Sequence, residues 1–385
     1  MTDISYPWEQ PLAVRVQQLQ SRTTKVMYFS DAPNPGSFRY RVYNMVCALE
    51  TETNNISASY FSEADGHRVL ELVKQVDRLV IHRTLYTDFV ARLILTARHH
   101  NVPVFYDIDD YVFDELAVPK LVHNLEQLPN SGENADAVWT TWFGWVTRYR
   151  MVLERCDKVL TTTQFLADLV EKTTGKTASV VRNFLGVDET QISEQVYAAK
   201  LNNPLPRNSE SIGYFAGSYS HQRDLEVAAP GICQFLAERP NATFQLFGYG
   251  DLDRAGLTEF GDQVTQHDFV AYQELPQLIA EVGINIAPLL QNDFTNAKSE
   301  LKYFSAAAVG TLTIATPTAP MLAAIKPNAT GWLADGSDWY QALTTWADTP
   351  ASQQNEMVAA AHADAIANYT APGVIGQLLK ALDLA

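Results

Sequence analysis

The residues best suited to chemistry lie in the C-terminal half of the chain, between a polar loop and a short apolar run. The loop 291–296 precedes Lys298 and Ser299, and a stretch of small residues then leads to Gly310 and the apolar run 312–315. This order predicts a loop, a helix that begins at Lys298 and Ser299, and a strand. The N-terminus of a helix presents unpaired N–H groups, so a cation and a hydroxyl beside it favour a phosphate. The alternative is an ordinary crossover helix in which Ser299 is a cap and Lys298 a solvated charge.

Two arginines close to a glycine form a second candidate site near the N-terminus. The apolar run 25–30 is followed by a turn-rich segment that contains Gly36, and a helical pattern begins near Arg39 and Arg41. An anionic group could meet both arginines and the unpaired N–H groups at this helix start. The alternative is that both arginines are solvated on the surface of a helix.

Charged residues also follow two predicted strands of the N-terminal half. His82 and Arg83 follow 78–81, and Asp107, Asp109 and Asp110 follow 104–106. Neighbouring carboxylates repel one another unless a cation, a hydrogen-bond donor or a hydroxyl-rich substrate compensates them. We favour Asp109 and Asp110 as hydrogen-bond acceptors, base or electrostatic stabiliser towards a sugar or an acceptor. A Mg²⁺ site and a structural cap for the next segment remain alternatives.

The elements that must position these residues alternate between strand and helix in both halves. The expected strands are residues 25–30, 57–61, 78–82, 102–106, 158–162 and 179–181, then 211–216, 243–247, 267–270, 283–289, 312–315 and 331–333. Such alternation predicts two doubly wound parallel sheets, in which ligands gather at the carboxyl ends of the strands. The polar stretch 186–206 is expected to be the linker between the halves. Residues 139–153 show an aromatic helical face that either packs on the domain or contacts a lipid.

Length and composition narrow the class of protein. A chain of 385 residues predicts two domains. The net charge of -16 argues against binding nucleic acid. Cys47, Cys156 and Cys233 are widely spaced and suggest neither a zinc site nor a disulfide framework. The start lacks a signal-peptide pattern, and no apolar run approaches the length of a membrane span, so we expect a cytoplasmic, soluble protein.

Taken together, these motifs resemble the retaining GT-B glycosyltransferases, the family of sucrose synthase and many bacterial lipopolysaccharide and exopolysaccharide sugar transferases. The resemblance covers nearly the whole chain and is strongest from 212 to 316. It depends on the loop 217–224, on the strand end 246–250 and on the segment 267–276 before a Glu-Leu-Pro helix start. It depends also on Ala306-Ala307-Ala308-Val309-Gly310 and the strand that follows.

The resemblance implies a role for each candidate residue. The implied catalytic residues are Asp109, Asp110, Arg223 and Lys298. The implied donor-binding residues are Gly217, Ser218, His221, Arg223, Gly248, Gly250, Phe269, Val270, Lys298, Ser299 and Ser305. The implied acceptor-binding residues are Gly36, Arg39, Arg41, His82 and Arg83. The sequence departs from the family where Ala297 and Ser305 replace two glutamates, of which the second binds ribose, and where Asp109 replaces a histidine near the transferred sugar.

The activity implied by the resemblance is transfer of a sugar, with retention, from a nucleotide-diphosphate donor to a saccharide or lipid-linked acceptor in polysaccharide or glycoconjugate synthesis. It implies Rossmann-like domains at 1–205 for the acceptor and 206–370 for the donor, with a helix at 371–385 that packs back on the first. No cofactor or metal is expected, and contact with the inner membrane face is an added possibility. The alternatives are a GT-B epimerase or phosphorylase, or a catalytically silent nucleotide- or carbohydrate-binding protein.

Overall fold

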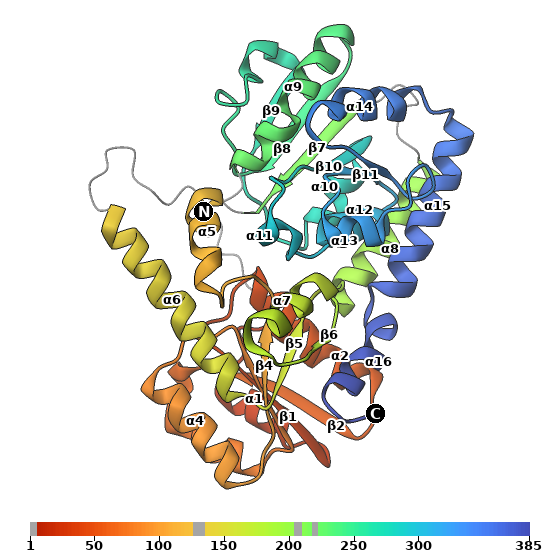
Figure 1. Cartoon of the computed structure of the whole chain (residues 1–385). Coiled ribbons are helices and arrows are strands. Elements are labelled where there is room, and N and C mark those ends of the chain that lie inside the picture. The colour runs from red at the N-terminus through yellow and green to blue at the C-terminus, as the bar shows by residue number, and fades with distance from the viewer. Residues whose placement is uncertain (1–5, 126–134, 204–209, 218–221) are drawn as a thin grey trace.

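The chain forms two α/β domains, one above the other (Figure 1). The computed structural model describes residues 6–125, 135–203, 210–217 and 222–385. Each domain contains a sheet of six parallel strands with helices on its faces. The predicted fold class of two doubly wound parallel sheets is therefore confirmed.

The N-terminal sheet has the strand order β2-β1-β3-β4-β5-β6. Its strands are β1 (Thr24–Ser30), β2 (Ile56–Phe61), β3 (Arg78–His82), β4 (Val104–Ile108), β5 (Lys158–Thr161) and β6 (Ala178–Val180). The order reverses between β1 and β3, where Ser30 lies opposite His82 in the parallel register. A crevice opens at such a reversal, at the carboxyl ends of the strands.

The C-terminal sheet has the order β12-β11-β10-β7-β8-β9. Its strands are β7 (Ser211–Ala216), β8 (Thr243–Gly248), β9 (Val264–His267), β10 (Ile284–Ala287), β11 (Leu312–Ala315) and β12 (Trp332–Leu333). Here the order reverses between β7 and β10, the arrangement of dinucleotide-binding folds. β1 is buried at five consecutive positions and β7 and β10 are buried throughout, as expected of parallel strands covered by helices on both faces.

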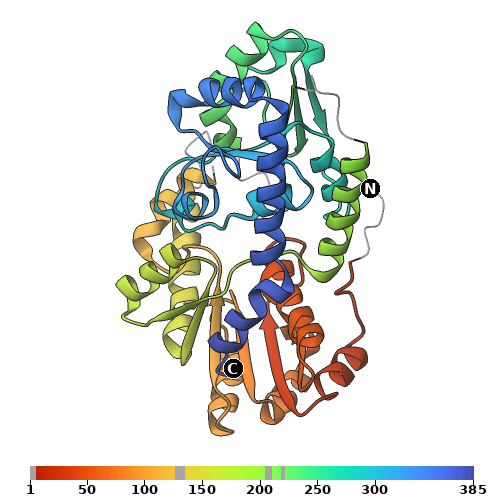
Figure 2. The ribbon, with the colours of Figure 1, turned by 90° about the vertical axis from the view of Figure 1, so that its right-hand side faces the viewer.

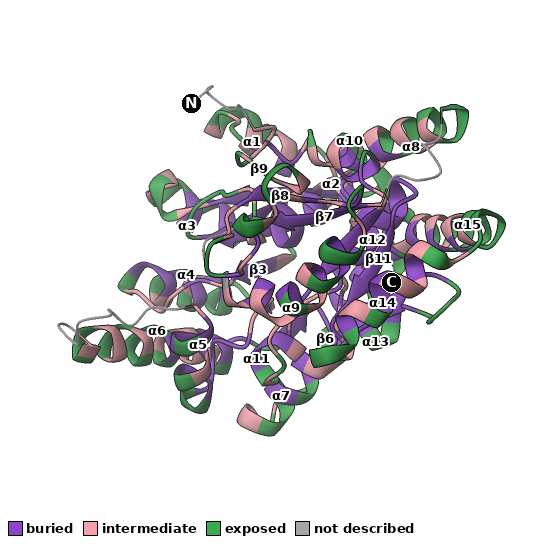
Figure 3. Cartoon of the chain, turned by 90° about the horizontal axis from the view of Figure 1, so that it is seen from above, coloured by how far each residue is buried: buried purple, intermediate pink, exposed green. Residues whose placement is uncertain are grey.

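Helices cover both sheets and turn an exposed side to the solvent, as the view from above shows (Figure 3). Those before β7 are α1 (Leu12–Leu19), the π-helical turn η1 (Arg39–Tyr43), α2 (Asn44–Glu52), η2 (Glu63–Asp65), α3 (His67–Leu72), η3 (Val73–Gln75), α4 (Asp88–His99), η4 (Glu115–Ala117), α5 (Val118–Asn124), α6 (Ala135–Arg155), α7 (Gln164–Thr174) and α8 (Val187–Asn202). Those after β7 are α9 (Gln222–Glu238), η6 (Thr258–Gln263), α10 (Leu275–Ala280), α11 (Asp293–Asn296), α12 (Leu301–Ala308), α13 (Ala319–Ala324), η7 (Gly336–Asp338), α14 (Trp339–Asp348), α15 (Ala351–Asn368) and α16 (Ala371–Ala381).

Three expected boundaries differ from the structure. The helix expected to begin at Lys298 begins at Leu301, because the short helix α11 and a turn occupy the residues before it. The strand expected at 267–270 is β9, which ends at His267. Most of the expected linker is the helix α8, which has acidic residues in its first turn but no apolar stripe that the sequence would reveal.

The aromatic face of α6 packs mainly on its own domain. Val146 and Leu153 are buried, and Trp139 and Trp142 pack against the same cluster. Trp145 remains 40% exposed. Among the described residues, no helix has the length and apolarity needed to cross a membrane.

The C-terminal helix returns to the N-terminal domain (Figure 2). α15 runs from the second domain towards the first, and α16 packs on α2 and β6. Val374 and Leu378 are fully buried in one cluster with Val42 and Leu49. The last turns of the chain therefore complete a core that belongs to the first domain.

Candidate active site

A cavity of about 420 Å³ lies where the carboxyl ends of the two sheets face each other. The N-terminal domain contributes residues that follow β1, β3 and β4, and the C-terminal domain residues that follow β7, β8 and β10. The lining residues predicted from the sequence are Gly36, Arg39, Arg83, Asp109, Asp110, Gly217, Gly248, Phe269, Val270, Lys298, Ser299 and Ser305. The topology thus brings most of the candidate residues together in one cavity.

An acid pair and an arginine form the N-terminal wall of this cavity. Arg83 Nη1 lies 3.1 Å from Asp109 Oδ1 and 2.7 Å from Asp110 Oδ2. Its backbone φ of 36° is unusual for a residue with a side chain, and it follows directly from the end of β3. Burial disfavours the charged form of Asp109, but Arg83, His82 and Ser37 outweigh this effect and hold its pKa well below the usual range. The cavity therefore contains a permanently ionised carboxylate.

Three side chains, Ser37, His82 and Ser30, are joined by hydrogen bonds behind Asp109. Ser37 Oγ donates to Asp109 Oδ2, so its oxygen must accept from His82 Nε2, 2.9 Å away. Burial lowers the pKa of His82 to about 4, so the imidazole is neutral and carries one N–H. Its Nδ1 is therefore the acceptor, and Ser30 Oγ donates to it across 3.0 Å. These hydrogen bonds thus all run in one direction: Ser30 donates to His82, His82 to Ser37, and Ser37 to the carboxylate of Asp109.

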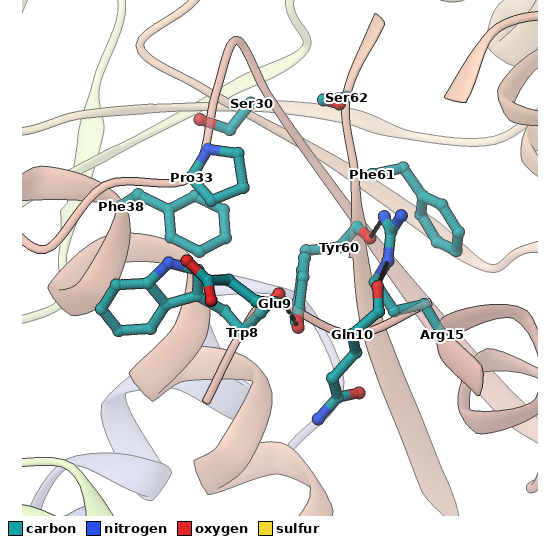
Figure 4. A pocket seen from close by; sticks show the side chains of 10 residues that line it. All are labelled: Trp8, Glu9, Gln10, Arg15, Ser30, Pro33, Phe38, Tyr60, Phe61 and Ser62. Atoms are coloured by element: carbon teal, nitrogen blue, oxygen red, sulfur yellow. Dashed lines mark hydrogen bonds between the residues drawn. The ribbon is translucent and has the colours of Figure 1, made fainter. Parts of the chain in front are cut away.

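A smaller cavity of about 180 Å³ lies at the other end of this series (Figure 4). Ser30 and Phe38 line it together with Trp8 and Tyr60. Arg15 also reaches it, but its guanidinium is held by a bidentate pair with Asp65. The two cavities share no lining residue, but His82 hydrogen-bonds Ser30 of the small cavity and Ser37 of the large one.

Two lysines near the start of α12 form the opposite wall. Lys298 Nζ lies 3.7 Å from Asp110 Oδ1 and 4.5 Å from the centre of the Phe294 ring. Lys302 Nζ lies 4.1 Å from the centre of the Tyr214 ring. Burial lowers the pKa of Lys302 to about 8, against the opposing effect of Asp224. An anion in the cavity would therefore meet two cations, one just before α12 and one in its first turn.

The strand end at Gly248 shapes the part of the cavity beside Phe269 and Val270. Gly248 has a φ of 92°, and a Cβ there would lie 2.3 Å from the Ala216 carbonyl oxygen. Only glycine permits this close approach of β7 and β8. Gly217 follows at the end of β7 and has open space around it.

Some of the predicted residues lie elsewhere. Arg41 is fully buried and does not line the cavity, because η1 turns its guanidinium inward to Asp107, with both contacts at 2.8 Å. His82 is buried, and neither His82 nor Gly250 is among the residues that line the cavity. The structure therefore does not bring these three residues to the acceptor or donor positions that the sequence predicted for them.

Arg223 is also absent from the cavity wall. Its Nη1 lies 3.2 Å from His123 Nδ1 of α5, across the domain interface. The expectation that Arg223 and Lys298 face the same cavity is not met in this arrangement. Ser218 and His221 lie outside the described residues.

Several lining residues were missed by the sequence analysis: Ser37, Asn183, Glu189, Tyr272 and Lys302. Lys302 follows Lys298 at a spacing of four in the helix that the sequence predicted from Lys298, so the pair could have been noticed. Asn183 gave no signal, although its Nδ2 donates to Ser299 Oγ across the interface at 3.0 Å.

Comparison with known proteins identifies the second domain. Residues 210–348 match the family model described as glycosyl transferases group 1. This segment is a group 1 glycosyltransferase domain. It contains Gly248, Lys298 and Lys302, and so it forms the C-terminal wall of the cavity. No curated protein matches the chain by sequence.

Solved structures show that the whole chain has the GT-B fold. HepE of Anabaena, in complex with UDP and glucose, aligns over 94% of this chain and 100% of its own, with a TM-score of 0.63 and 11% identity. A glycosyltransferase of Rickettsia africae aligns over the same shares at a TM-score of 0.62 and 11% identity. Sucrose-phosphate synthase of Thermosynechococcus elongatus aligns over 94% of this chain and 99% of its own, with a TM-score of 0.60 and 12% identity. The predicted GT-B resemblance is confirmed.

Proposed function

We propose that this protein is a glycosyltransferase that moves a sugar from a nucleotide-diphosphate donor to a saccharide or lipid-linked acceptor. The observation that carries this proposal is the meeting of Lys298 with Asp110 in the cavity between the domains. A cation beside the start of a helix suits the diphosphate, and the acids opposite suit the sugar and acceptor. The complex of HepE with UDP and glucose supports the same class of donor.

The leaving nucleoside diphosphate gains negative charge as the bond to the sugar breaks. Lys298, Lys302 and the N–H groups at the start of α12 would stabilise this charge. The ionised Asp109 carboxylate would stabilise the positive charge that grows on the anomeric carbon. Within this proposal the acceptor attacks from the face that the diphosphate leaves, so the anomeric configuration is retained, and no metal ion takes part. The reaction would take place in the cytoplasm and contribute to polysaccharide or glycoconjugate synthesis.

The test measures acceptor-dependent release of nucleoside diphosphate from a panel of nucleotide sugars, with lipid-linked oligosaccharides as acceptors. Lys298→Ala removes a charge contact to the leaving group, so turnover should fall about 100-fold or more. Lys326→Ala removes an exposed lysine of the same domain and should leave turnover unchanged. Near wild-type turnover in Lys298→Ala would contradict the diphosphate site. Donor conversion without acceptor, or only with inorganic phosphate, would instead indicate an epimerase or a phosphorylase.

A further inference from the structure

A buried ion pair forms part of the cavity wall and is not explained by the diphosphate site. Arg39 Nη1 from η1 lies 3.2 Å from Glu189 Oε1 at the start of α8. Both side chains are 6% exposed, and both line the cavity. Each comes from a different element, so the pair also joins the N-terminal domain to the helix that precedes β7.

Both members of this pair have unused hydrogen-bonding capacity. Arg39 donates from Nη1 to Glu189 and from Nη2 to the Tyr40 hydroxyl, whereas its Nε has no hydrogen-bond partner among the described residues. Glu189 Oε2 accepts one long bond of 3.4 Å from the Gly186 N–H. A carboxylate can accept about four hydrogen bonds, and a buried ion pair is stabilising only when further bonds satisfy both partners. The pair therefore offers a donor and an acceptor side by side.

The pair lies in the wall of the same cavity as residues that suit a nucleotide. The Arg39 guanidinium stacks 4.3 Å from the centre of the Tyr272 ring, which follows Phe269 and Val270. The Arg39 guanidinium also lies 4.2 Å from the centre of the Tyr40 ring, and Tyr40 lines the cavity together with Ser305, which lies about one turn along α12 from Lys302. A nucleoside diphosphate placed with its base near Phe269 and its phosphates near the lysines would bring its ribose to this pair.

We propose that Arg39 and Glu189 bind the vicinal diol of the donor's ribose. A diol presents a donor and an acceptor on adjacent carbons, so one hydroxyl donates to the Glu189 carboxylate and the other accepts from Arg39. Ser305, which the sequence analysis expected at the ribose, lines the same cavity. This inference depends on the proposed function, since it presupposes that a nucleotide occupies the cavity.

The test compares binding of two ligands to the same protein by titration calorimetry. The ligands are uridine diphosphate and 2′,3′-dideoxyuridine diphosphate, and the adenosine and guanosine pairs are measured in the same way. Hydrogen bonds to charged groups discriminate strongly, so the wild type should prefer a ribonucleotide over its dideoxy analogue by about tenfold or more. Glu189→Gln removes the charge at nearly constant volume, and the preference should fall to below about threefold.

The ratio of the two dissociation constants is informative even when a variant is destabilised, because both ligands bind the same folded protein. Glu194→Gln alters an exposed carboxylate on the same helix and should preserve the preference. Arg39→Lys keeps Glu189 paired but removes the Nε–H donor, and it should lower the preference by about threefold. An unchanged preference in both Glu189→Gln and Arg39→Lys would overturn the ribose assignment alone. Failure of every nucleoside diphosphate to bind the wild type would overturn the proposed function as well.

Discussion

Among single residues, Asp109 shows how the environment fixes the charge state of a carboxylate in the cavity wall. Its carboxylate accepts hydrogen bonds from Ser37 and Arg83, and His82 stands behind Ser37 as a neutral imidazole. Neutral His82 accepts a hydrogen bond from Ser30 and donates one to Ser37. Protonation of His82 would remove the acceptor and so break the hydrogen bond from Ser30. His82 is therefore expected to position Asp109 rather than to touch a substrate.

The neutrality of His82 predicts a pH dependence of stability. The pKa of His82 is about 4 in the folded protein and near 6.5 when unfolded, so the unfolded state binds more protons between these values. The contribution of neutral His82 to the free energy of unfolding is fully present above about pH 6.5 and is lost as the pH falls towards 4. Between about pH 7.5 and pH 5, the free energy of unfolding should fall by roughly 2 kcal/mol more in the wild type than in His82→Gln.

Urea unfolding of both proteins at the two pH values measures this difference. The glutamine amide can keep one donor towards Ser37 and one acceptor towards Ser30, but it cannot be protonated. Parallel pH dependences in the two proteins would show that His82 does not remain neutral.

The sequence could reveal Asp109 and Asp110 because charged residues directly after an apolar run are visible in one dimension, and Lys298 because it stands beside Ser299 before a stretch of small residues. It could not reveal Glu189, whose helix lacks an apolar stripe and looked like a linker. Arg41 was misplaced for a related reason. The π-helical turn η1 changes which side chains point outward, and Arg41 became the buried partner of Asp107.

Among the elements, the end of β8 lies very close to β7 at Gly248, and a substitution there tests whether the cavity needs this close approach. Gly248→Ala would place a methyl group against the Ala216 carbonyl at a φ that L-residues rarely adopt. We expect a loss of at least about 2 kcal/mol in the free energy of unfolding, together with weaker nucleotide binding. Gly217→Ala, also in the cavity wall but with nothing within 4 Å of the new methyl, should be nearly neutral for stability. Equal stability of the two variants, measured by chemical denaturation, would contradict this account.

The order of the elements was predictable and their ends were less so. All six strands of each sheet were expected from apolar runs, and each lies at or near its expected position. The start of α12 was placed three residues too early, because α11 is a separate short helix whose Asn292 cap resembles ordinary loop sequence. This shift matters, since it brings Lys302 rather than Ser299 into the first turn of α12.

Across the whole molecule, several polar side-chain contacts join the two domains. Asn292 Nδ2 lies 3.2 Å from Asn124 Oδ1, Lys120 pairs with Asp293, and Tyr272 donates to Asp188 at 2.8 Å. No pattern within either half could predict such pairs, because each depends on how the two sheets face each other. The cavity is thus a property of the complete chain rather than of the group 1 domain alone.

The return of α16 to the first domain leads to a prediction about the stability of the entire protein. Leu378 is fully buried among Val42, Leu49 and other residues of the N-terminal core, although it lies near the end of the chain. Leu378→Ala should therefore lower the free energy of unfolding by about 2–5 kcal/mol, the range for a large buried aliphatic side chain. Gln377→Ala, at the exposed neighbouring position, should change it by less than about 0.5 kcal/mol.

Hydrogen exchange of amides in β1 and α2 shows where this loss is felt. Because α16 packs on α2, these N-terminal segments should exchange faster in Leu378→Ala, while β7 and β8 in the other domain should change less. Faster exchange confined to α15 and α16, with α2 unchanged, would mean that the last helix is an independent appendage. The proposed transferase needs both domains held at one cavity, so the same variant should also lose sugar transfer at temperatures where the wild type is still folded.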